Sequence, residues 1–359
     1  MRITFPRLGN SHRYGRLLFQ EMGIEFVVPA INSPKGLERG SLISPEEICL
    51  PFKLMADNLL TAWEEGADTV IMPATMGPCR LGEYAELLKV ILDRQGCQYR
   101  WILLDSVNAI GLKELSRRLR MIVTDSPCSL NQILCALKDV YRVIKEFEYL
   151  EAEARIRCGY EIKKGASKTV LRECRKFLEK AKSIKEAQDF ILESQKKLKE
   201  IEIDPSKKPL KLLLTGEIYT SIEAFGNHNI EERLMDMGIA FEKRISIGWW
   251  IDHTIVNPFG GLLLEKSTNK HMPHSIGGYA KVTVKEVTRY KQGGFDGIIQ
   301  VLPAGCMPEI VAKSVFDGLG RDEGLPVLTI IFDEMCGEAG YITRIEAFTD
   351  MLIRKREKQ

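Results

Sequence analysis

Three cysteines stand at positions that present a thiol to a ligand. Cys79 and Cys306 each follow an apolar run that ends in proline and glycine, which predicts a loop between a strand and a helix. Cys49 precedes Pro51 in a segment predicted to be helical from Ser44, so that Pro51 interrupts the helix beside the thiol. Partial positive charge at a helix N-terminus favours the thiolate, the form that attacks or binds metal.

A fourth cysteine, Cys336, lies in the segment 333–340 that follows the predicted strand 327–332, and it is a candidate ligand, a nearby spare thiol or a chance substitution. None of the nine cysteines forms a C-x-x-C pair, so zinc ribbons, thioredoxin-like pairs and ferredoxin-type runs are not supported. Any ligands must therefore meet in space. The remaining cysteines are interpreted as packing or surface residues: Cys97, Cys128, Cys135, Cys158 and Cys174.

Phosphate-binding loops are absent from the sequence. It contains no G-x-x-x-x-G-K-S/T loop and no G-x-G-x-x-G after a predicted strand. The chain therefore has no visible nucleotide site of its own.

Two α/β stretches must position these cysteines. Short apolar runs alternate with amphipathic segments up to about residue 110 and again from residue 210, which predicts parallel sheets built from βαβ units. Residues 66–79 and 294–306 share the order aspartate, apolar run, proline, glycine and cysteine. We interpret the two halves as equivalent. Ligands of parallel sheets bind beyond the carboxyl ends of the strands, where Cys79 and Cys306 are predicted.

The middle of the chain is rich in lysine, glutamate, arginine, leucine and alanine, with charges three and four residues apart. This pattern is typical of helices with a solvated charged face, and we assign it no chemistry. The fold class is thus α/β, with two Rossmann-like parallel-sheet domains at 1–110 and 209–359 and a helical insertion at 111–208 between them.

Composition excludes several classes of protein. Hydrophobic residues make up 45% and charged residues 28%, which indicates a globular protein. The net charge is only +2, so nucleic acid is not expected as the main partner. No uncharged apolar run is long enough to cross a bilayer, and the first residues do not resemble a signal peptide. We expect a cytoplasmic protein that does not enter the membrane.

Four motifs in order resemble one family. The segments 44–53 (SPEEICLPFK), 77–84 (GPCRLGEY), 305–309 (GCMPE) and 333–348 are similar to the 2-hydroxyacyl-CoA dehydratase D-component and benzoyl-CoA reductase-like family. The resemblance is greatest to its acyl-CoA dehydratase activase-related branch, also called CoA-substrate-specific enzyme activase, and extends to double-cubane cluster proteins.

This resemblance implies an oxygen-sensitive iron–sulfur cluster in a cleft between two Rossmann-like domains, either a four-iron four-sulfur (4Fe–4S) cubane or a double cubane. The implied ligands are Cys49, Cys79 and Cys306, with Cys336 at a position where the family does not commonly have cysteine. Side chains near these motifs could tune the cluster or could simply be helix caps or surface ion pairs: Arg80, Glu309, Glu334 and Arg344.

The implied partner is a separate ATP-dependent activator of the actin/Hsp70 type that carries its own cluster, together with a homodimer mate or paralogous subunit. The leading hypothesis is a redox component of the reductase or dehydratase type. The alternatives are a non-catalytic cluster carrier or electron relay, and a zinc-binding structural protein. Four cysteine ligands including Cys336 would favour the carrier, and an open iron would favour catalysis. The sequence assigns neither a catalytic residue nor a substrate.

Overall fold

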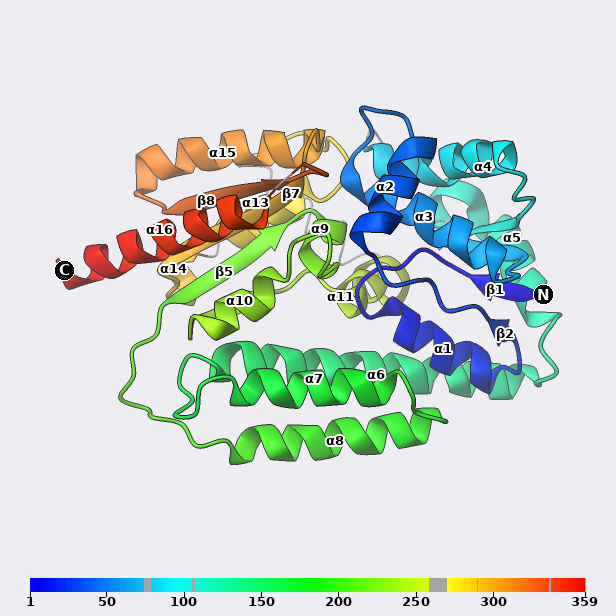
Figure 1. Ribbon diagram of the computed structural model, residues 1–359, viewed down its shortest axis with the longest axis horizontal. Coiled ribbons are helices and arrows are strands. Elements are labelled where there is room, and N and C mark those ends of the chain that lie inside the picture. Colours follow the sequence, from blue (N-terminus) through cyan, green and yellow to red (C-terminus); the bar gives the residue numbers. More distant parts are fainter. Residues whose placement is uncertain (74–78, 105–106, 258–269, 289, 336, 359) are drawn as a thin grey trace. The chain divides into compact units, whose positions relative to one another are not determined.

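The computed structural model describes residues 1–73, 79–104, 107–257, 270–288, 290–335 and 337–358 (Figure 1). It divides into two compact units. The first contains Met1–Glu146 and Phe177–Asp189, and the second contains Phe147–Lys176 and Phe190–Gln359. The three-part division predicted from composition stays a prediction.

Each unit is built around one parallel sheet. The strands are β1 (Arg2–Thr4), β2 (Glu25–Phe26), β3 (Thr69–Pro73), β4 (Arg100–Leu104), β5 (Lys211–Gly216), β6 (Ala240–Lys243), β7 (Gly297–Pro303) and β8 (Val327–Phe332). The first sheet has the order β2-β1-β3-β4 and the second has the order β6-β5-β7-β8, with all neighbours parallel. The predicted α/β class with two Rossmann-like domains is confirmed.

Helices connect the strands of each sheet. In the first half they are α1 (Ser11–Glu21), α2 (Pro34–Ile43), α3 (Leu50–Glu64), the 3₁₀ helix η1 (Arg80–Glu83), α4 (Tyr84–Arg94) and α5 (Val107–Val123). In the second half they are α9 (Ile218–Ile222), α10 (Ile230–Asp236), α11 (Ile247–Ile251), the π-helix η2 (Asp252–Val256), α13 (Ala280–Thr288), α14 (Tyr290–Gly293), α15 (Met307–Glu323) and α16 (Glu338–Glu357).

An aspartate fixes the same strand pair in both sheets. Asp68, just before β3, accepts from the backbone N–H of Arg2, and its own N–H donates to the Arg2 carbonyl. Asp296, just before β7, makes the same two hydrogen bonds with Lys211. Arg2 and Lys211 are the first residues of β1 and β5, so the repeated aspartate sets the register of the two central strands. The two halves are equivalent, as the repeated motif predicts.

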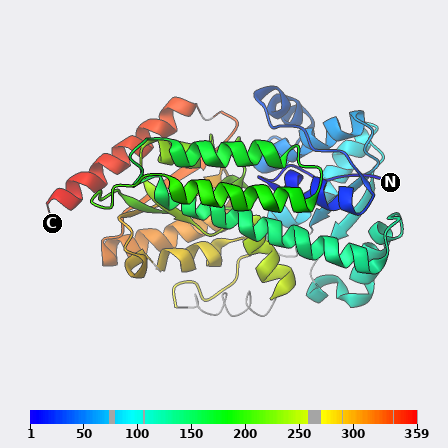
Figure 2. The same ribbon diagram turned by 90° about the horizontal axis from the view of Figure 1, so that it is seen from below.

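Three long helices lie between the two sheets in sequence: α6 (Leu130–Arg157), α7 (Ala166–Leu178) and α8 (Ile184–Glu200). Figure 2 shows them running side by side. The prediction of a solvated charged face is wrong for Glu151 and Arg155, which are only 8% and 5% exposed. Charge spacing alone cannot identify such residues, because their partners come from distant segments.

The prediction of a helix that begins at Ser44 is wrong. Ser44 instead ends α2, where its hydroxyl donates to the Gly40 carbonyl at 2.6 Å, and α3 begins at Leu50. Pro51 occupies the first turn of α3, where its missing N–H costs no intrahelical hydrogen bond. Pro51 therefore starts this helix rather than interrupting it, and Cys49 is the N-cap residue.

A second helix also begins later than expected. The residue pattern from Ser275 to Gln292 is helical and predicts a helix that begins at Ser275, but α13 starts at Ala280. Gly277 and Gly278 have φ angles of 77° and 57°, which are left-handed and incompatible with a right-handed helix. The helix start that the sequence places at Ser275 is therefore absent from the described backbone.

Close packing of α2 on α3 holds the start of α3 in place. A Cβ atom added at Gly40 would overlap the carbonyl oxygen of Lys53, and one at Gly36 would overlap the carboxylate of Asp57. Arg39 of α2 also donates to Asp57 at 2.6 Å. The small residues of α2 therefore allow a close approach to the first turns of the helix that carries Cys49.

Candidate functional site

Cys49 and Cys79 each stand immediately before a helix. Cys49 caps α3 with extended backbone (φ −68°, ψ 150°), and its carbonyl accepts from Phe52 N–H at 3.0 Å. Cys79 caps η1 with φ −78° and ψ 128°, and its carbonyl accepts from Gly82 N–H at 3.1 Å. The N–H groups at the start of α3 favour negative charge on a nearby sulfur, and no acidic residue lies in that first turn.

Two hydrogen bonds join the segments that carry these cysteines. Arg80, next to Cys79, donates from Nη1 to the Glu47 carbonyl at 3.0 Å. Tyr84, the first residue of α4, places its hydroxyl within hydrogen-bonding distance of the Cys49 sulfur. Lys53 lies one turn after Cys49 and donates to the Glu46 carbonyl at 3.2 Å. The structure thus brings together the two cysteine segments of the first unit.

Cys306 occupies the corresponding position in the second sheet. Its N–H donates to the Pro303 carbonyl at 3.2 Å, and Gly305 has a φ of 72°, as a type II turn requires. Its carbonyl accepts from Ile310 N–H at the start of α15. Because β3 and β7 are equivalent strands, Cys79 and Cys306 follow the same strand in their respective sheets. The Cys306 side chain is buried.

Glu309 is held beside the sheet in the first turn of α15. It is 1% exposed and accepts from Thr283 Oγ1 at 3.0 Å and from Gln300 Nε2 at 2.9 Å. Burial is the main reason that the pKa of Glu309 is raised to about 7, and the charge of Glu217 raises it further. Burial also raises the pKa of Glu217, which caps α9 through the N–H groups of Tyr219 and Thr220.

The other predicted tuning residues are placed differently. Arg344 is exposed and donates to the carbonyl of Thr329 at 2.7 Å, while Thr329 Oγ1 donates to Gln300 at 3.0 Å. Arg344 is therefore linked to Glu309 through β8 and β7. Glu334 is exposed after β8, and Cys336 lies outside the described residues.

The remaining cysteines follow their predicted roles. Cys97, Cys158 and Cys174 are buried among core residues, whereas Cys128 is half-buried and Cys135 is exposed. None of the eight described cysteines forms a disulfide.

The described ranges contain no group of three or more His, Cys, Asp or Glu side chains that could hold a metal ion. The candidate donors are instead divided between the units, with Cys49 and Cys79 in the first and Cys306 in the second. Thiols at helix starts are donors of the kind that iron–sulfur clusters use, so the donor chemistry fits such a group.

Sequence reasoning missed several side chains around these cysteines. Tyr84 is the last residue of the segment 77–84, which carries part of the family resemblance and contains Cys79. Its place in that segment is the feature of the sequence that could have identified it. Thr283 and Gln300 gave no such signal, because they reach Glu309 from a helix and a strand that precede it in the sequence.

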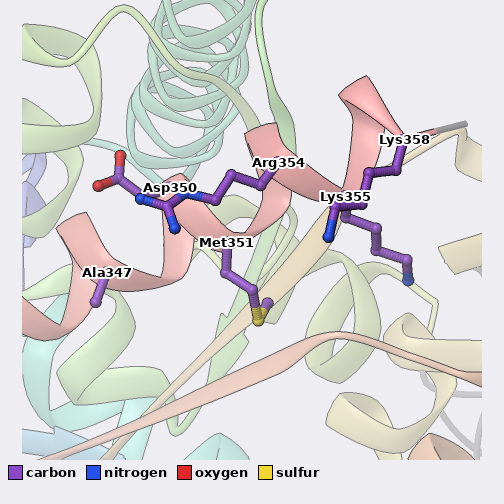
Figure 3. A pocket seen from close by; sticks show the side chains of 6 residues that line it. All are labelled: Ala347, Asp350, Met351, Arg354, Lys355 and Lys358. Atoms are coloured by element: carbon purple, nitrogen blue, oxygen red, sulfur yellow. The ribbon is translucent and has the colours of Figure 1, made fainter.

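An open cavity of about 600 Å³ lies along the second half of α16 (Figure 3). Its described lining is Ala347, Asp350, Met351, Arg354, Lys355 and Lys358. Nearby, Arg356 binds the carbonyls of Lys208 and Pro209, which precede β5. The cavity therefore lies toward the amino ends of the strands, whereas Cys306 follows the carboxyl end of β7.

Fold and site together define an α/β protein with two equivalent parallel sheets, in which a cysteine follows the equivalent strand of each. Residues 10–243 match the family described as CoA enzyme activase uncharacterised domain. The chain therefore belongs to this activase-related family of the acyl-CoA dehydratase system. The matched residues include Cys49 and Cys79 and end before Cys306. A search of curated proteins found no match.

The more specific likeness to the dehydratase D-component stays a prediction. In the described part of the chain, no helix combines the length and the apolar character needed to span a lipid bilayer.

Proposed function

We propose that this chain is an iron–sulfur redox component of an acyl-CoA dehydratase-type system, with Cys49, Cys79 and Cys306 as thiolate ligands. The cluster would supply one-electron chemistry at low potential. The main support is that hydrogen bonds from Arg80 and Tyr84 join the segment after Cys79 to the segment that carries Cys49 in the first unit. In the second unit, Cys306 follows the strand that corresponds to the one before Cys79.

Membership of the activase-related family supports a dehydratase enzyme as partner. We further propose that electrons come from a separate ATP-dependent activator of the actin/Hsp70 type, and that the chain pairs with itself or with a paralogous subunit.

Anaerobic purification followed by measurement of iron, acid-labile sulfide and zinc tests this function. About four irons per chain with matching sulfide would support a single cubane and justify an assay of ATP-driven reduction with an activator. Stoichiometric zinc without sulfide would overturn the redox function and favour a zinc-binding structural protein.

Single cysteine replacements test the ligand assignment. We expect Cys49→Ser, Cys79→Ser and Cys306→Ser each to lose most of the bound iron, because a serine hydroxyl is a poor substitute for a thiolate ligand. Cys135→Ser is the matched control and should retain it, because Cys135 is exposed on α6. Iron content per folded chain is the measurement. Wild-type iron content in Cys49→Ser, Cys79→Ser and Cys306→Ser would show that these cysteines are not the ligands.

A further inference from the structure

The Tyr84 side chain connects α4 to the start of α3. It is 2% exposed, and its ring packs edge-on against Phe52 with centroids 5.1 Å apart and an interplanar angle of 84°. This packing leaves the ring little freedom to rotate away. The hydroxyl at its end lies within hydrogen-bonding distance of the Cys49 sulfur.

The backbone around Cys49 is held from two further directions. Arg80 binds the carbonyl of Glu47, and Lys53 binds the carbonyl of Glu46. Both carbonyls belong to the turn that leads into Cys49, so contacts from η1 and α3 hold the backbone before Cys49 while Tyr84 contacts its sulfur. A sulfur held in this way can keep one hydrogen-bond partner throughout a reaction.

The direction of the hydrogen bond follows from the charge on the sulfur. A neutral thiol could donate to the phenol oxygen, but a thiolate or a metal-bound sulfur can only accept. Hydrogen bonds to charged acceptors are about twice as strong as neutral ones. The Tyr84 hydroxyl therefore stabilises the charged form of the sulfur more than the neutral form.

We propose that Tyr84 is a positioning residue that donates its hydroxyl hydrogen to the Cys49 sulfur and thereby stabilises negative charge on it. This inference rests on the proposed function, in which Cys49 is a cluster ligand. Hydrogen bonds to ligand sulfurs are one of the means by which proteins set cluster potentials. Tyr84 thus makes the cluster easier to reduce, because reduction adds negative charge to its sulfurs.

Tyr84→Phe removes the hydroxyl and retains the ring that packs on Phe52. Tyr99→Phe is the matched control, since Tyr99 is also buried in the first unit, packs edge-on against Trp63 and donates its hydroxyl to the Leu59 carbonyl at 2.6 Å. Both variants lose one buried hydroxyl hydrogen bond. Only Tyr84→Phe removes a partner of Cys49.

The first measurement is the midpoint potential of the cluster in the anaerobically purified protein, monitored by the EPR signal of the reduced cluster. We expect Tyr84→Phe to disfavour reduction about tenfold, a downward shift of about 59 mV for a one-electron couple. Tyr99→Phe should keep the wild-type potential, and both variants should keep the wild-type iron content. An unchanged potential in Tyr84→Phe, or an equal shift in Tyr99→Phe, would overturn the inference.

A second measurement needs no cluster. In the metal-free chain, iodoacetamide labelling of Cys49 at pH 7 is followed by peptide mass spectrometry. We expect the thiolate fraction of Cys49 to be about tenfold smaller in Tyr84→Phe. Each thiolate is then more nucleophilic, which offsets part of this loss, so labelling should be about threefold slower. Labelling at the wild-type rate would contradict the inference.

The two measurements separate this inference from the proposed function. If the wild-type chain holds no iron or sulfide, the proposed function fails, and the labelling rates still decide whether Tyr84 stabilises charge on Cys49. If iron is bound but potential and labelling are unchanged in Tyr84→Phe, the function stands and the role of Tyr84 is rejected.

Discussion

Glu231→Gln is expected to lower the free energy of unfolding by about 3–5 kcal/mol, because it removes the carboxylate that pairs directly with two buried cations. Glu231, in the first turn of α10, pairs with Arg155 of α6 at 2.9 Å and with Lys243 of β6. The side chains of both cations are 6% exposed, so water cannot replace the lost carboxylate. Urea unfolding of the wild type and the variant measures the difference.

The neighbouring Glu232 provides the matched control. Its side chain is 40% exposed and lies 3.5 Å from Arg175, so Glu232→Gln should change stability by less than about 1 kcal/mol. Equal destabilisation by the two substitutions would show that the loss of negative charge on α10 matters, rather than the buried ion pairs.

The dependence of this contribution on pH has a definite sign. Burial alone would raise the pKa of Glu231, but Lys243 and Arg155 outweigh it and lower the pKa from 4.5 to about 2. The contribution is therefore fully present above about pH 4.5 and is lost as the pH falls toward 2. Glu231→Gln should accordingly flatten the acid limb of the stability profile.

This ion network also explains why the middle of the chain was only partly predictable. The helices themselves follow from composition and charge spacing, which are local properties of the sequence. The burial of Arg155 depends instead on Glu231, which lies 76 residues away along the chain. Local patterns cannot identify such a pair, so the sequence indicated a solvated surface where the fold forms a buried network.

The repeated aspartates show the opposite case. Asp68 and Asp296 hold equivalent strands through the same backbone hydrogen bonds, and the sequence repeat around them predicted equivalent halves. The error at Ser44 arose because serine can both end and begin a helix. Its hydroxyl donates backward to Gly40 rather than accepting from the following turn.

Glu309 gives the second large expected effect, which concerns neutral rather than acidic pH. The folded protein raises the pKa of this carboxyl from 4.5 to about 7, so the folded state holds a proton that the unfolded state releases between these values. The contribution of Glu309 to stability is therefore greatest below about pH 4.5, and it decreases as the pH rises toward 7. The shift corresponds to about 3 kcal/mol.

Glu309→Gln should remove this dependence, because glutamine has the shape of the protonated carboxyl and cannot ionise. Its amide can accept from Gln300 and donate to Thr283, the two side chains that bind Glu309. We expect the variant to match the wild type near pH 4, where Glu309 is protonated in both states, and to exceed its stability by up to about 3 kcal/mol at pH 8. Unfolding free energies measured across this range provide the test.

Glu346→Gln, which removes an exposed carboxylate from α16, controls for the change in net charge. If its stability profile changed as much as that of Glu309→Gln, the effect would belong to overall charge rather than to the buried carboxyl. His12, whose pKa is lowered to about 2 mainly by burial, makes the wild-type stability rise with pH up to about 6.5, so the readout is the difference between Glu309→Gln and the wild type. A difference that stays constant from pH 4 to pH 8 would show that the fold does not raise the pKa of Glu309. The protein thus keeps a buried acid, one turn after Cys306, at a cost in stability near neutral pH.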